Sequence, residues 1–230
     1  MELSGARVLV VGATGVLGGL TTRALVDAGA QVVVTGRDSD RLGEVAAVTG
    51  HDPITLDVVD VEACAAAVDA AGAALGGLDG IVVATGVPAF GPATETDPAV
   101  AEELFAVNTL GPMALVRAAS RHLDGGVVVV LSAILADLPT NQMAEYSASK
   151  SALSAWLGVV RRENRRRFHV IDVRPPHLDT GLSDRGLAGT PPRLPEPLAG
   201  TVVVDRVLDA IRADASEVVW DAKAKELVVR

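Results

Sequence analysis

Valine-rich runs alternate with helical patterns along the whole chain, and this alternation constrains the fold more than any other feature. Strand-like runs are expected at residues 6–12, 31–36, 53–57, 78–86, 125–133, 168–175 and 216–220. A helical pattern separates each run from the next. Parallel strands joined in this way form an open sheet with helices on both faces, because such crossovers are right-handed. We therefore predict the α/β class, with a doubly wound open parallel sheet of about seven strands and helices on both faces.

The composition fits a sheet of this kind. Hydrophobic residues make up 49% of the 230 residues but aromatic residues only 3%, so valine, alanine and leucine must build the core. Aliphatic strands without alternation are typical of parallel sheets that helices cover on both sides. We expect residues 1–230 to form a single domain. The Gly- and Pro-rich segment 177–200 is long for a loop, and its position after a strand favours a substrate lid over a disordered tract.

Charge and cysteine content limit the classes of partner. The formal net charge of −9 and the isoelectric point near 4.9 argue against nucleic acids and anionic membranes as partners. The basic run 161–167 ends a helical pattern, where cations complement the helix dipole, so we interpret it as a solvated helix end. Cys64 is the only cysteine, which argues against a cysteine-based metal site. We find no leader and no apolar run of the ~18 residues that a membrane span needs, and we expect a cytoplasmic protein.

Three glycines follow the first expected strand in the sequence VVGATGVLGG. A tight turn at this point needs positive φ, the backbone must approach a diphosphate closely, and the next helix must pack on the strand. The helix N-terminus adds free N–H groups and the positive end of its dipole. In an alternating chain this pattern predicts a Rossmann-type dinucleotide-binding domain. The loop residues expected to contact the cofactor are Gly12, Thr14, Gly15, Val16, Leu17 and Gly18.

The end of the second expected strand bears on the choice between NAD and NADP. An acidic residue there binds the ribose 2′-hydroxyl, whereas an arginine accommodates a 2′-phosphate. Here the strand ends in TGR, so Arg37 occupies that point, with Thr35 as a possible hydroxyl donor. An exposed arginine at a helix start is the alternative, and the nearby Asp38 weakens the electrostatic case. We favour NADP(H) over NAD(H).

Tyr146 is the only tyrosine, and Lys150 follows it by one helical turn on the same face of an expected helix. A tyrosine with its usual pKa near 10 is a poor acid or base at neutral pH. A neighbouring ammonium and a positively charged oxidised nicotinamide would favour the phenolate and lower that pKa. A tyrosine packed on the sheet beside a solvated lysine is the simpler interpretation of a bare YxxxK pattern. The context of the pattern has to decide between the two.

That context consists of several motifs in a fixed order. They are GATGVLG in the glycine loop, LDV at 56–58, ATG at 84–86, VNTLG at 107–111, a serine on the fifth strand, YSASK, and RPPHLDT at 174–180. Over nearly its whole length the chain resembles the short-chain dehydrogenase/reductase family. It has the size and YxASK pattern of the short members, but its glycine spacing is that of atypical members.

The resemblance implies roles for individual residues. Tyr146 would exchange a proton with the substrate oxygen, Lys150 would bind the nicotinamide ribose and lower the tyrosine pKa, and Ser132 would orient the carbonyl. Asn108 would anchor a water that links the lysine to solvent. Further cofactor contacts implied by the resemblance are Asp57 and Val58 at the adenine, Ala84, Thr85, Gly86, Pro175, and Thr180 at the carboxamide.

Ser132 departs from the family pattern. Members often have two serines after the fifth strand, and the second, thirteen positions before the tyrosine, is catalytic. Here Ala133 stands at that position and Ser132 precedes it. Either an extra residue in the following loop lets Ser132 reach the substrate, which we favour, or the site lacks its serine. Side chains alternate along a strand, so an uncompensated shift would turn Ser132 away.

Two hypotheses of function follow. The first is an NADP-dependent oxidoreductase that acts on a small-molecule carbonyl or secondary alcohol, with hydride transfer to or from the nicotinamide. The second is a catalytically weak or inactive NADP-binding sensor or interaction protein, motivated by the displaced serine and by VATG where members often have NNAG. The intact pair of Tyr146 and Lys150 favours the first. By resemblance we also expect a homodimer or homotetramer, paired through the helices around Asn108 and Trp156.

Overall fold

The computed structural model describes residues 1–230, and its eight strands form one sheet in the order β3-β2-β1-β4-β5-β6-β7-β8. The strands are β1 (Arg7–Val11), β2 (Gln31–Gly36), β3 (Ile54–Thr55), β4 (Gly80–Val83), β5 (Gly126–Leu131), β6 (Phe168–Arg174), β7 (Glu217–Asp221) and β8 (Glu226–Val229). All neighbouring strands are parallel except β7 and β8. The strand order changes direction between β1 and β4, and sheets of this type bind ligands at such a point, beyond the carboxyl ends of the strands.

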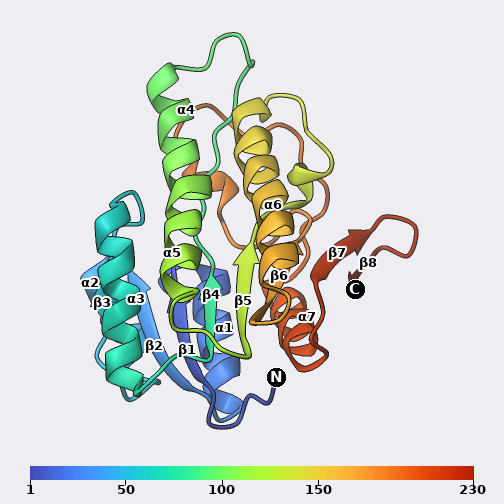
Figure 1. The fold of residues 1–230 in the computed structure, drawn as a ribbon. Helices are drawn as coiled ribbons and strands as arrows, with labels where there is room; N and C mark the ends of the chain where they lie inside the picture. The colour runs from blue at the N-terminus through green and yellow to red at the C-terminus, as the bar shows by residue number, and fades with distance from the viewer.

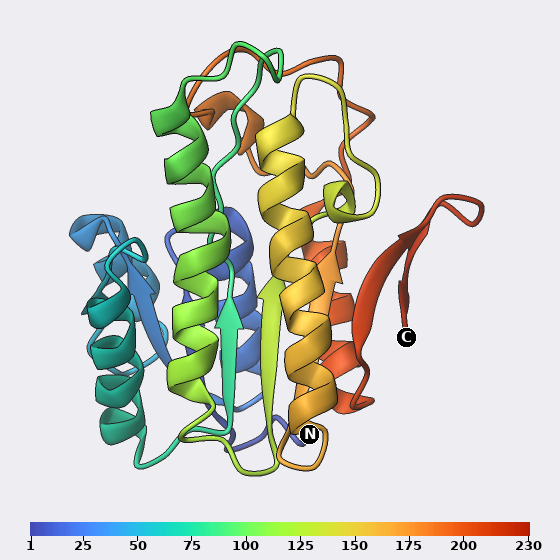
Figure 2. The ribbon, with the colours of Figure 1, turned by 45° about the horizontal axis from the view of Figure 1, so that its top comes forward.

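Helices cover both faces of the sheet. They are α1 (Val16–Asp27), α2 (Ser39–Ala46), α3 (Val61–Leu75), α4 (Pro98–Phe105), α5 (Gly111–Ala119), α6 (Ala144–Asn164) and α7 (Gly200–Arg212), with a π-helix η1 (Ala106–Leu110) and 3-10 turns η2 (Ile134–Ala136) and η3 (Ser183–Arg185). Figures 1 and 2 show α3, α5 and α6 as one layer in front of the sheet, with α1 and α7 behind it. The predicted doubly wound α/β sheet is confirmed.

The alternation of side chains along each strand divides the core into two apolar layers. On β1, Leu9 and Val11 pack on the side of α3, α5 and α6, whereas Val8 and Val10 pack on the side of α1 and α7. All four side chains are buried, which is why the strand reads as a continuous aliphatic run in the sequence.

The prediction of about seven parallel strands was incomplete, because β8 adds an eighth, antiparallel strand. The Asp221 carboxylate accepts hydrogen bonds from the backbone N–H groups of Lys223 (2.8 Å) and Ala224 (3.0 Å), and this closes the turn between β7 and β8. Lys225 completes the turn with φ at 54°. Figure 2 shows the resulting hairpin projecting from the edge of the sheet. Aspartate at the start of a turn and the aliphatic run that follows were present in the sequence as signals of this hairpin.

Helix α4, the π-helix η1 and helix α5 form one continuous helical stretch. Pro112 lies at the start of α5, and the irregular turn falls just before it, in the π-helix. The stretch Pro98–Ala119 has 22 residues and a hydropathy of 1.3 in its most apolar window, long and apolar enough to cross a membrane by length and composition alone. Half of that window is buried within the fold, as in a helix that packs on a core.

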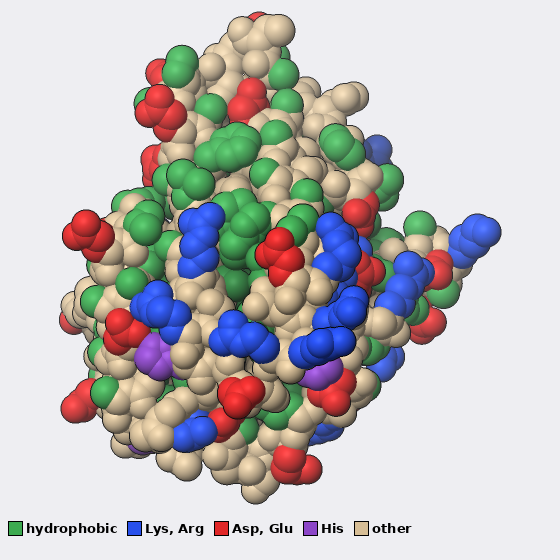
Figure 3. Space-filling view, viewed as in Figure 1, with side chains coloured by type: hydrophobic (Ala, Val, Ile, Leu, Met, Phe, Trp, Pro, Cys, Tyr) green, Lys and Arg blue, Asp and Glu red, His purple; other side chains and the backbone are tan.

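The basic run at the end of α6 serves the fold in part. Arg161 donates to the carbonyl oxygens of Val170 (3.0 Å) and Ser216 (2.7 Å), and Arg167 donates to that of Ser120 (2.8 Å). Figure 3 shows Lys and Arg side chains on this face interspersed with Asp and Glu. These hydrogen bonds tie the helix end to neighbouring strands and to the end of α5.

Candidate active site

A cleft of about 1290 Å³ opens at the carboxyl edge of the sheet. It is lined by the glycine loop, by the segments that follow β2, β4 and β5, by the start of α6, and by much of the segment 177–198. Trp220, Ala222 and Lys225 of the hairpin between β7 and β8 also border it. The sequence interpretation missed this contribution because it did not include β8.

The glycine loop leaves room for a close ligand because two of its glycines cannot carry a side chain. Gly12 has φ at +82°, and a Cβ there would lie 3.0 Å from the carbonyl carbon and oxygen of Ala84. A Cβ on Gly18 would lie 2.8 Å from the carbonyl carbon of Gly12 and 2.9 Å from the Cα of Ala13. Helix α1 then begins after Gly15 without a side-chain cap, so its first N–H groups stay available to an anion.

The structure gathers nearly all the predicted cofactor residues along one cleft. The lining includes Gly12, Thr14, Gly15, Val16, Leu17, Arg37, Asp57, Val58, Ala84, Thr85, Gly86, Tyr146, Lys150, Pro175 and Thr180. Gly18 is the exception: it is buried behind the loop, where it allows α1 to pack closely on β1. Its role is therefore in shaping the loop.

The cleft also carries unpartnered polar groups, which tests whether a dinucleotide fits. The hydroxyls of Thr35 and Thr85 are buried and have no hydrogen-bond partner in the protein, and both residues line the cleft. Buried hydroxyls are normally hydrogen-bonded, so these two are suited to a polar ligand. Together with the side-chain-free glycine turn they fit a dinucleotide.

Two arginines follow β2, with Arg37 directly after the strand and Arg41 within α2. Arg37 lines the cleft and makes no hydrogen bond within the protein, so the alternative of an exposed arginine at a helix start fits the structure as well as a phosphate ligand does. Arg41, which sequence reasoning did not single out, reaches from α2 to the glycine loop and donates to the Thr14 carbonyl oxygen (2.7 Å). Asp38 uses its carboxylate to cap α2, accepting from the N–H groups of Asp40 and Arg41. The carboxylate that weakened the case for a 2′-phosphate is thus engaged with backbone.

Tyr146 and Lys150 lie on the first turns of α6, and both side chains are almost fully buried at the cleft. The Tyr146 hydroxyl has no protein partner, whereas the Lys150 Nζ donates to the carbonyl oxygen of Leu131 (3.1 Å). A Cβ on Gly86 would lie 3.3 Å from Lys150 Nζ and 3.4 Å from Asn108 Oδ1, so all three groups meet at the end of β4. Lys150 and Asn108 therefore lie close together beside Gly86, and Tyr146 precedes Lys150 by one helical turn.

Asn108 occupies the π-helix η1 and joins three elements. Its Oδ1 accepts from the N–H of Val87 (2.9 Å), and its Nδ2 donates to the Val87 carbonyl oxygen (2.9 Å) and to Ser149 Oγ (3.1 Å). π-helical turns are rare and frequently occur at functional sites. Asn108 does not itself border the cleft; it holds the segment after β4 against α6, next to Lys150.

Burial controls the ionisation of the pair. It raises the pKa of the Tyr146 phenol to about 12. It also lowers the pKa of the Lys150 ammonium to about 8, although the negative charge of Asp172 acts in the opposite direction. Both shifts reflect the cost of a charge away from water. The Tyr146 phenol is therefore protonated at neutral pH.

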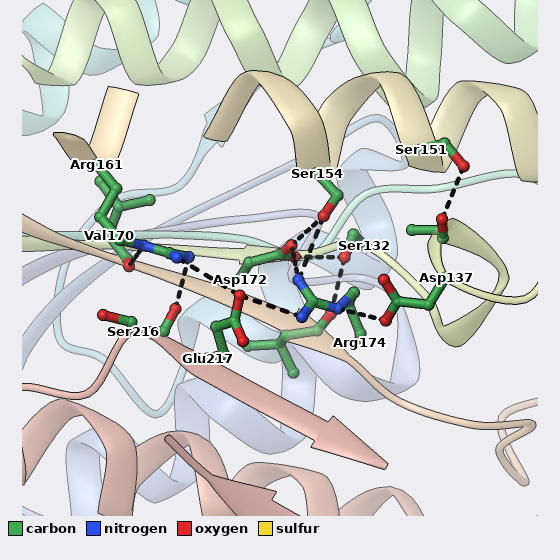
Figure 4. Close-up of polar contacts among 12 residues, drawn as sticks. Ser132, Asp137, Ser151, Ser154, Arg161, Val170, Asp172, Arg174, Ser216 and Glu217 are labelled. Carbon is green, nitrogen blue, oxygen red and sulfur yellow. Dashed lines mark hydrogen bonds and ion pairs between the residues drawn. The ribbon is translucent and has the colours of Figure 1, made fainter. Parts of the chain in front are cut away.

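Ser132 borders the cleft, but its hydroxyl is engaged by β6. It donates to Oδ1 of Asp172 on β6, and it lies 3.3 Å from the carbonyl oxygen of Val173 (Figure 4). The backbone at Ala133 is fully extended, with φ at −171° and ψ at 159°, so the side chains of Ser132 and Ala133 point to opposite sides. The backbone stays extended beyond the end of β5, and the hydroxyl is bound to Asp172, so whether Ser132 reaches the substrate stays a prediction.

Asp172 lies at the centre of a buried polar network. Its side chain is 1% exposed and also accepts from Ser154 Oγ (2.6 Å) and from Arg174 Nη1 (2.6 Å). Arg174 in turn contacts Glu217 on β7 (3.2 Å) and Asp137 in the loop after β5 (2.8 Å), as Figure 4 shows. The network links β5, β6, β7, α6 and the loop that leads to Tyr146.

The expected lid and the loop before α6 supply the rest of the cleft wall. In the loop before α6, Leu138 and Met143 border the cleft, whereas Asp137 and Gln142 do not. The segment 177–200 is tied to the segment after β4 by hydrogen bonds from Leu187 N to the Pro88 carbonyl (2.8 Å) and from Phe90 N to the Ala188 carbonyl (2.9 Å).

Comparison with known proteins agrees with this geometry. Residues 6–188 match the family model described as short chain dehydrogenase. The chain belongs to the short-chain dehydrogenase/reductase family. It is thus an NAD(P)-dependent oxidoreductase by family, as the arrangement of cleft, glycine loop and Tyr-Lys pair leads one to expect.

Individual relatives and one solved structure align with most of the chain. An uncharacterized oxidoreductase of Methylorubrum extorquens is 32% identical over 198 residues, 82% of this chain and 80% of the relative. The cyclic-di-GMP-binding biofilm dispersal mediator protein of Escherichia coli is 33% identical over 181 residues, 77% and 75% of the two chains. A short chain dehydrogenase from Burkholderia cenocepacia, solved in complex with NADP, is 30% identical with a TM-score of 0.84, over 97% of this chain and 91% of that one.

Proposed function

We propose that this protein transfers a hydride between NADP(H) and a carbonyl or secondary alcohol, with Tyr146 as the acid or base. The observation that carries the proposal is the Tyr146 hydroxyl, which borders the cleft without a protein partner and lies one helical turn from the buried Lys150. A free phenol beside a buried amine has no evident structural purpose, because a buried polar group normally has a partner.

The residues that would hold the cofactor are those that line the cleft from the glycine loop to the lid. Gly12 to Leu17 would hold the diphosphate, Asp57 and Val58 the adenine, and Lys150 and Thr180 the nicotinamide end. When bound, the nicotinamide nucleotide supplies the hydride, and the protein orients the reactants and moves the proton. The segment 177–200 would then close over the substrate as a lid.

Proton transfer would be the task of Tyr146. Because burial raises its pKa to about 12, the phenol is protonated at neutral pH and can donate its proton to a carbonyl oxygen. Lys150, held by the Leu131 carbonyl oxygen, would stabilise the phenolate that remains. Asn108 would keep Lys150 in place through its hydrogen bonds to Val87 and Ser149.

The test is NADPH consumption with a panel of aldehydes and ketones, for the wild-type protein and for Tyr146→Phe. General acid catalysis typically contributes about 10²–10⁴-fold to a rate, so we expect Tyr146→Phe to lower kcat by that factor. Its affinity for NADPH, measured by fluorescence titration, should stay within about twofold because the ring is kept. Equal turnover by the two proteins would refute the assignment.

The preference for NADP rests on the two arginines that follow β2. Arg37 is free to bind a phosphate, and Arg41 contacts the glycine loop at the Thr14 carbonyl oxygen. The NADP complex of the Burkholderia cenocepacia relative supports the same choice. We expect Arg37→Ala to weaken NADPH binding about 10–100-fold, since hydrogen bonds to charged groups contribute about 1.5–3 kcal/mol, and to leave NADH binding unchanged. Equal loss for both nucleotides, or no loss, would contradict the preference.

A second candidate function is binding of a nucleotide without turnover. The engaged Ser132 hydroxyl favours it, and so does the relative from Escherichia coli that is named for binding cyclic-di-GMP. Tight binding of NADPH or cyclic-di-GMP together with no turnover on the whole panel would select this candidate.

A further inference from the structure

The Tyr146 end of the cleft has very few hydrogen-bond donors for the carbonyl oxygen of a substrate. Around Tyr146, the Lys150 ammonium is directed to the Leu131 carbonyl, and the Asn108 amide is fully used by Val87 and Ser149. The Thr140 hydroxyl donates to the Leu138 carbonyl oxygen (3.2 Å). Of these groups only the Tyr146 hydroxyl stays free, and the unpartnered Thr85 hydroxyl belongs to the segment after β4 that is expected to bind the cofactor.

The Ser132 hydroxyl cannot be recruited without disturbing a buried charge. Its acceptor, Asp172, is 1% exposed and relies on three donors, which are Ser132, Ser154 and Arg174. Hydrogen bonds to charged groups contribute about 1.5–3 kcal/mol to stability. A buried carboxylate that loses a donor destabilises the fold by the full desolvation penalty of the unpaired charge. Figure 4 shows the Ser132 hydroxyl within this network, beside Asp172.

Ala133 presents only a methyl group on the other side of the extended chain. Ala133 lines the cleft and is buried, and its side chain carries no hydrogen-bond donor at this position. The neighbouring wall is apolar as well. Its side chains come from the segments after β4 and β5, from the loop before α6 and from the lid, and they are Val87, Phe90, Leu135, Leu138, Met143 and Leu194.

We propose that Ala133 leaves Tyr146 as the sole side-chain donor to the substrate oxygen and so restricts the enzyme to electrophilic carbonyls with an apolar substituent, aldehydes above all. The proposal rests on the proposed function. In the step, the carbonyl carbon gains a hydride from the reduced nicotinamide, the π electrons move to oxygen, and that oxygen takes the Tyr146 proton. An aldehyde thus becomes a primary alcohol while NADPH becomes NADP⁺.

The physical reason is the charge that develops on oxygen. Removal of one donor from such a site typically costs about 10²–10³-fold in kcat. Substrates whose substituents already draw electrons from the carbonyl depend less on that donor. An alkyl ketone, with two electron-donating groups, depends on it most.

Three probe substrates separate electronic from steric effects: benzaldehyde, acetophenone and 2,2,2-trifluoroacetophenone. The two ketones are similar in shape but differ in electrophilicity. We expect the wild-type protein to reduce benzaldehyde and trifluoroacetophenone and to reduce acetophenone at least about 100-fold more slowly in kcat/KM. Slow reduction of both ketones would mean that shape decides, and would overturn the proposal.

Two adjacent substitutions give a matched pair. Ala133→Ser should raise kcat/KM for acetophenone by about 10-fold or more and leave benzaldehyde within about threefold, because the new hydroxyl faces the cleft. Ser132→Ala should leave the ratio between substrates within about threefold while lowering the thermal midpoint, since it removes a donor from Asp172. Loss of about 100-fold on all substrates in a folded Ser132→Ala protein would overturn the proposal, and so would an Ala133→Ser protein without gain.

The outcomes also distinguish this proposal from the proposed function. Turnover by Ala133→Ser but not by the wild-type protein would support the proposal that a donor is missing at position 133. It would refute the proposed oxidoreductase activity of the wild-type protein. If neither protein oxidises NADPH with any probe although NADPH binds, both proposals fail. If Ser132→Ala does not fold, the Ala133→Ser comparison still decides.

Discussion

The two ends of the cleft are built on different principles. At the glycine-loop end, the site is made of backbone: Gly12 and Gly18 leave space, and the start of α1 leaves N–H groups free. At the Tyr146 end, the site is made of side chains that compete for partners, and Asp172 takes the Ser132 hydroxyl. A backbone site is fixed by its own segment, whereas a side-chain site depends on what distant segments place beside it.

If this comparison holds, substitutions at the two ends should affect different quantities. The largest effect is expected for Asp172→Ala, which leaves the Arg174 guanidinium buried without its main partner. Removal of one member of a buried ion pair costs about 3–5 kcal/mol, so the free energy of unfolding from urea titrations should fall by that amount. NADPH affinity of the folded protein should stay within about twofold, since Asp172 lies outside the cleft.

Asp209→Ala is the control, because Asp209 forms only exposed ion pairs with Arg206 and Arg212. Such pairs contribute under about 1 kcal/mol. Equal losses for the two aspartates would show that the buried network has no special importance.

Gly18→Ala should act in the opposite way, on the cofactor rather than on the network. The new methyl would meet Gly12 and Ala13 backbone, which cannot move without shifting α1 from the loop. We expect NADPH affinity to fall by about 100-fold, comparable to the loss of one or two charged hydrogen bonds. Gly43→Ala is the control: its Cβ would have no atom within 4 Å, and alanine should stabilise α2 by about 0.5–1 kcal/mol. Unchanged NADPH binding by Gly18→Ala would break the comparison.

The smallest effect concerns Lys150 and pH. Its pKa is lowered from 10.5 to about 8 by burial, so above pH 8 the folded state has lost a proton that the unfolded state keeps. Stability therefore rises with pH in this window, by about 2 kcal/mol between about pH 7 and about pH 9.5. Urea unfolding at both pH values should show this rise in the free energy of unfolding for the wild-type protein, and Lys150→Met should lack it. A parallel pH dependence of the two proteins would contradict the burial of a titrating lysine.

Much of the fold was predictable because it is local. The alternation of strands and helices, the aliphatic strands and the glycine turn all follow from short stretches, and the predicted sheet was confirmed by the structure. The element that the sequence interpretation missed was β8. Its hairpin is short, and its aliphatic run is equally compatible with an irregular C-terminal segment. The hydrogen bonds of Asp221 that form its turn become evident only in the folded chain.

The candidate site divides in the same way. By itself the sequence determined the glycine loop, the helical spacing of Tyr146 and Lys150 and the identity of Ala133, because each depends on neighbours along the chain. Only the tertiary structure decided the partner of Ser132. The register of β5 against β6 pairs Val130 with Asp172 and brings that carboxylate beside the serine, across a sequence separation of 40 residues. A hydroxyl binds the strongest acceptor within reach, and which acceptor is within reach is a property of the sheet.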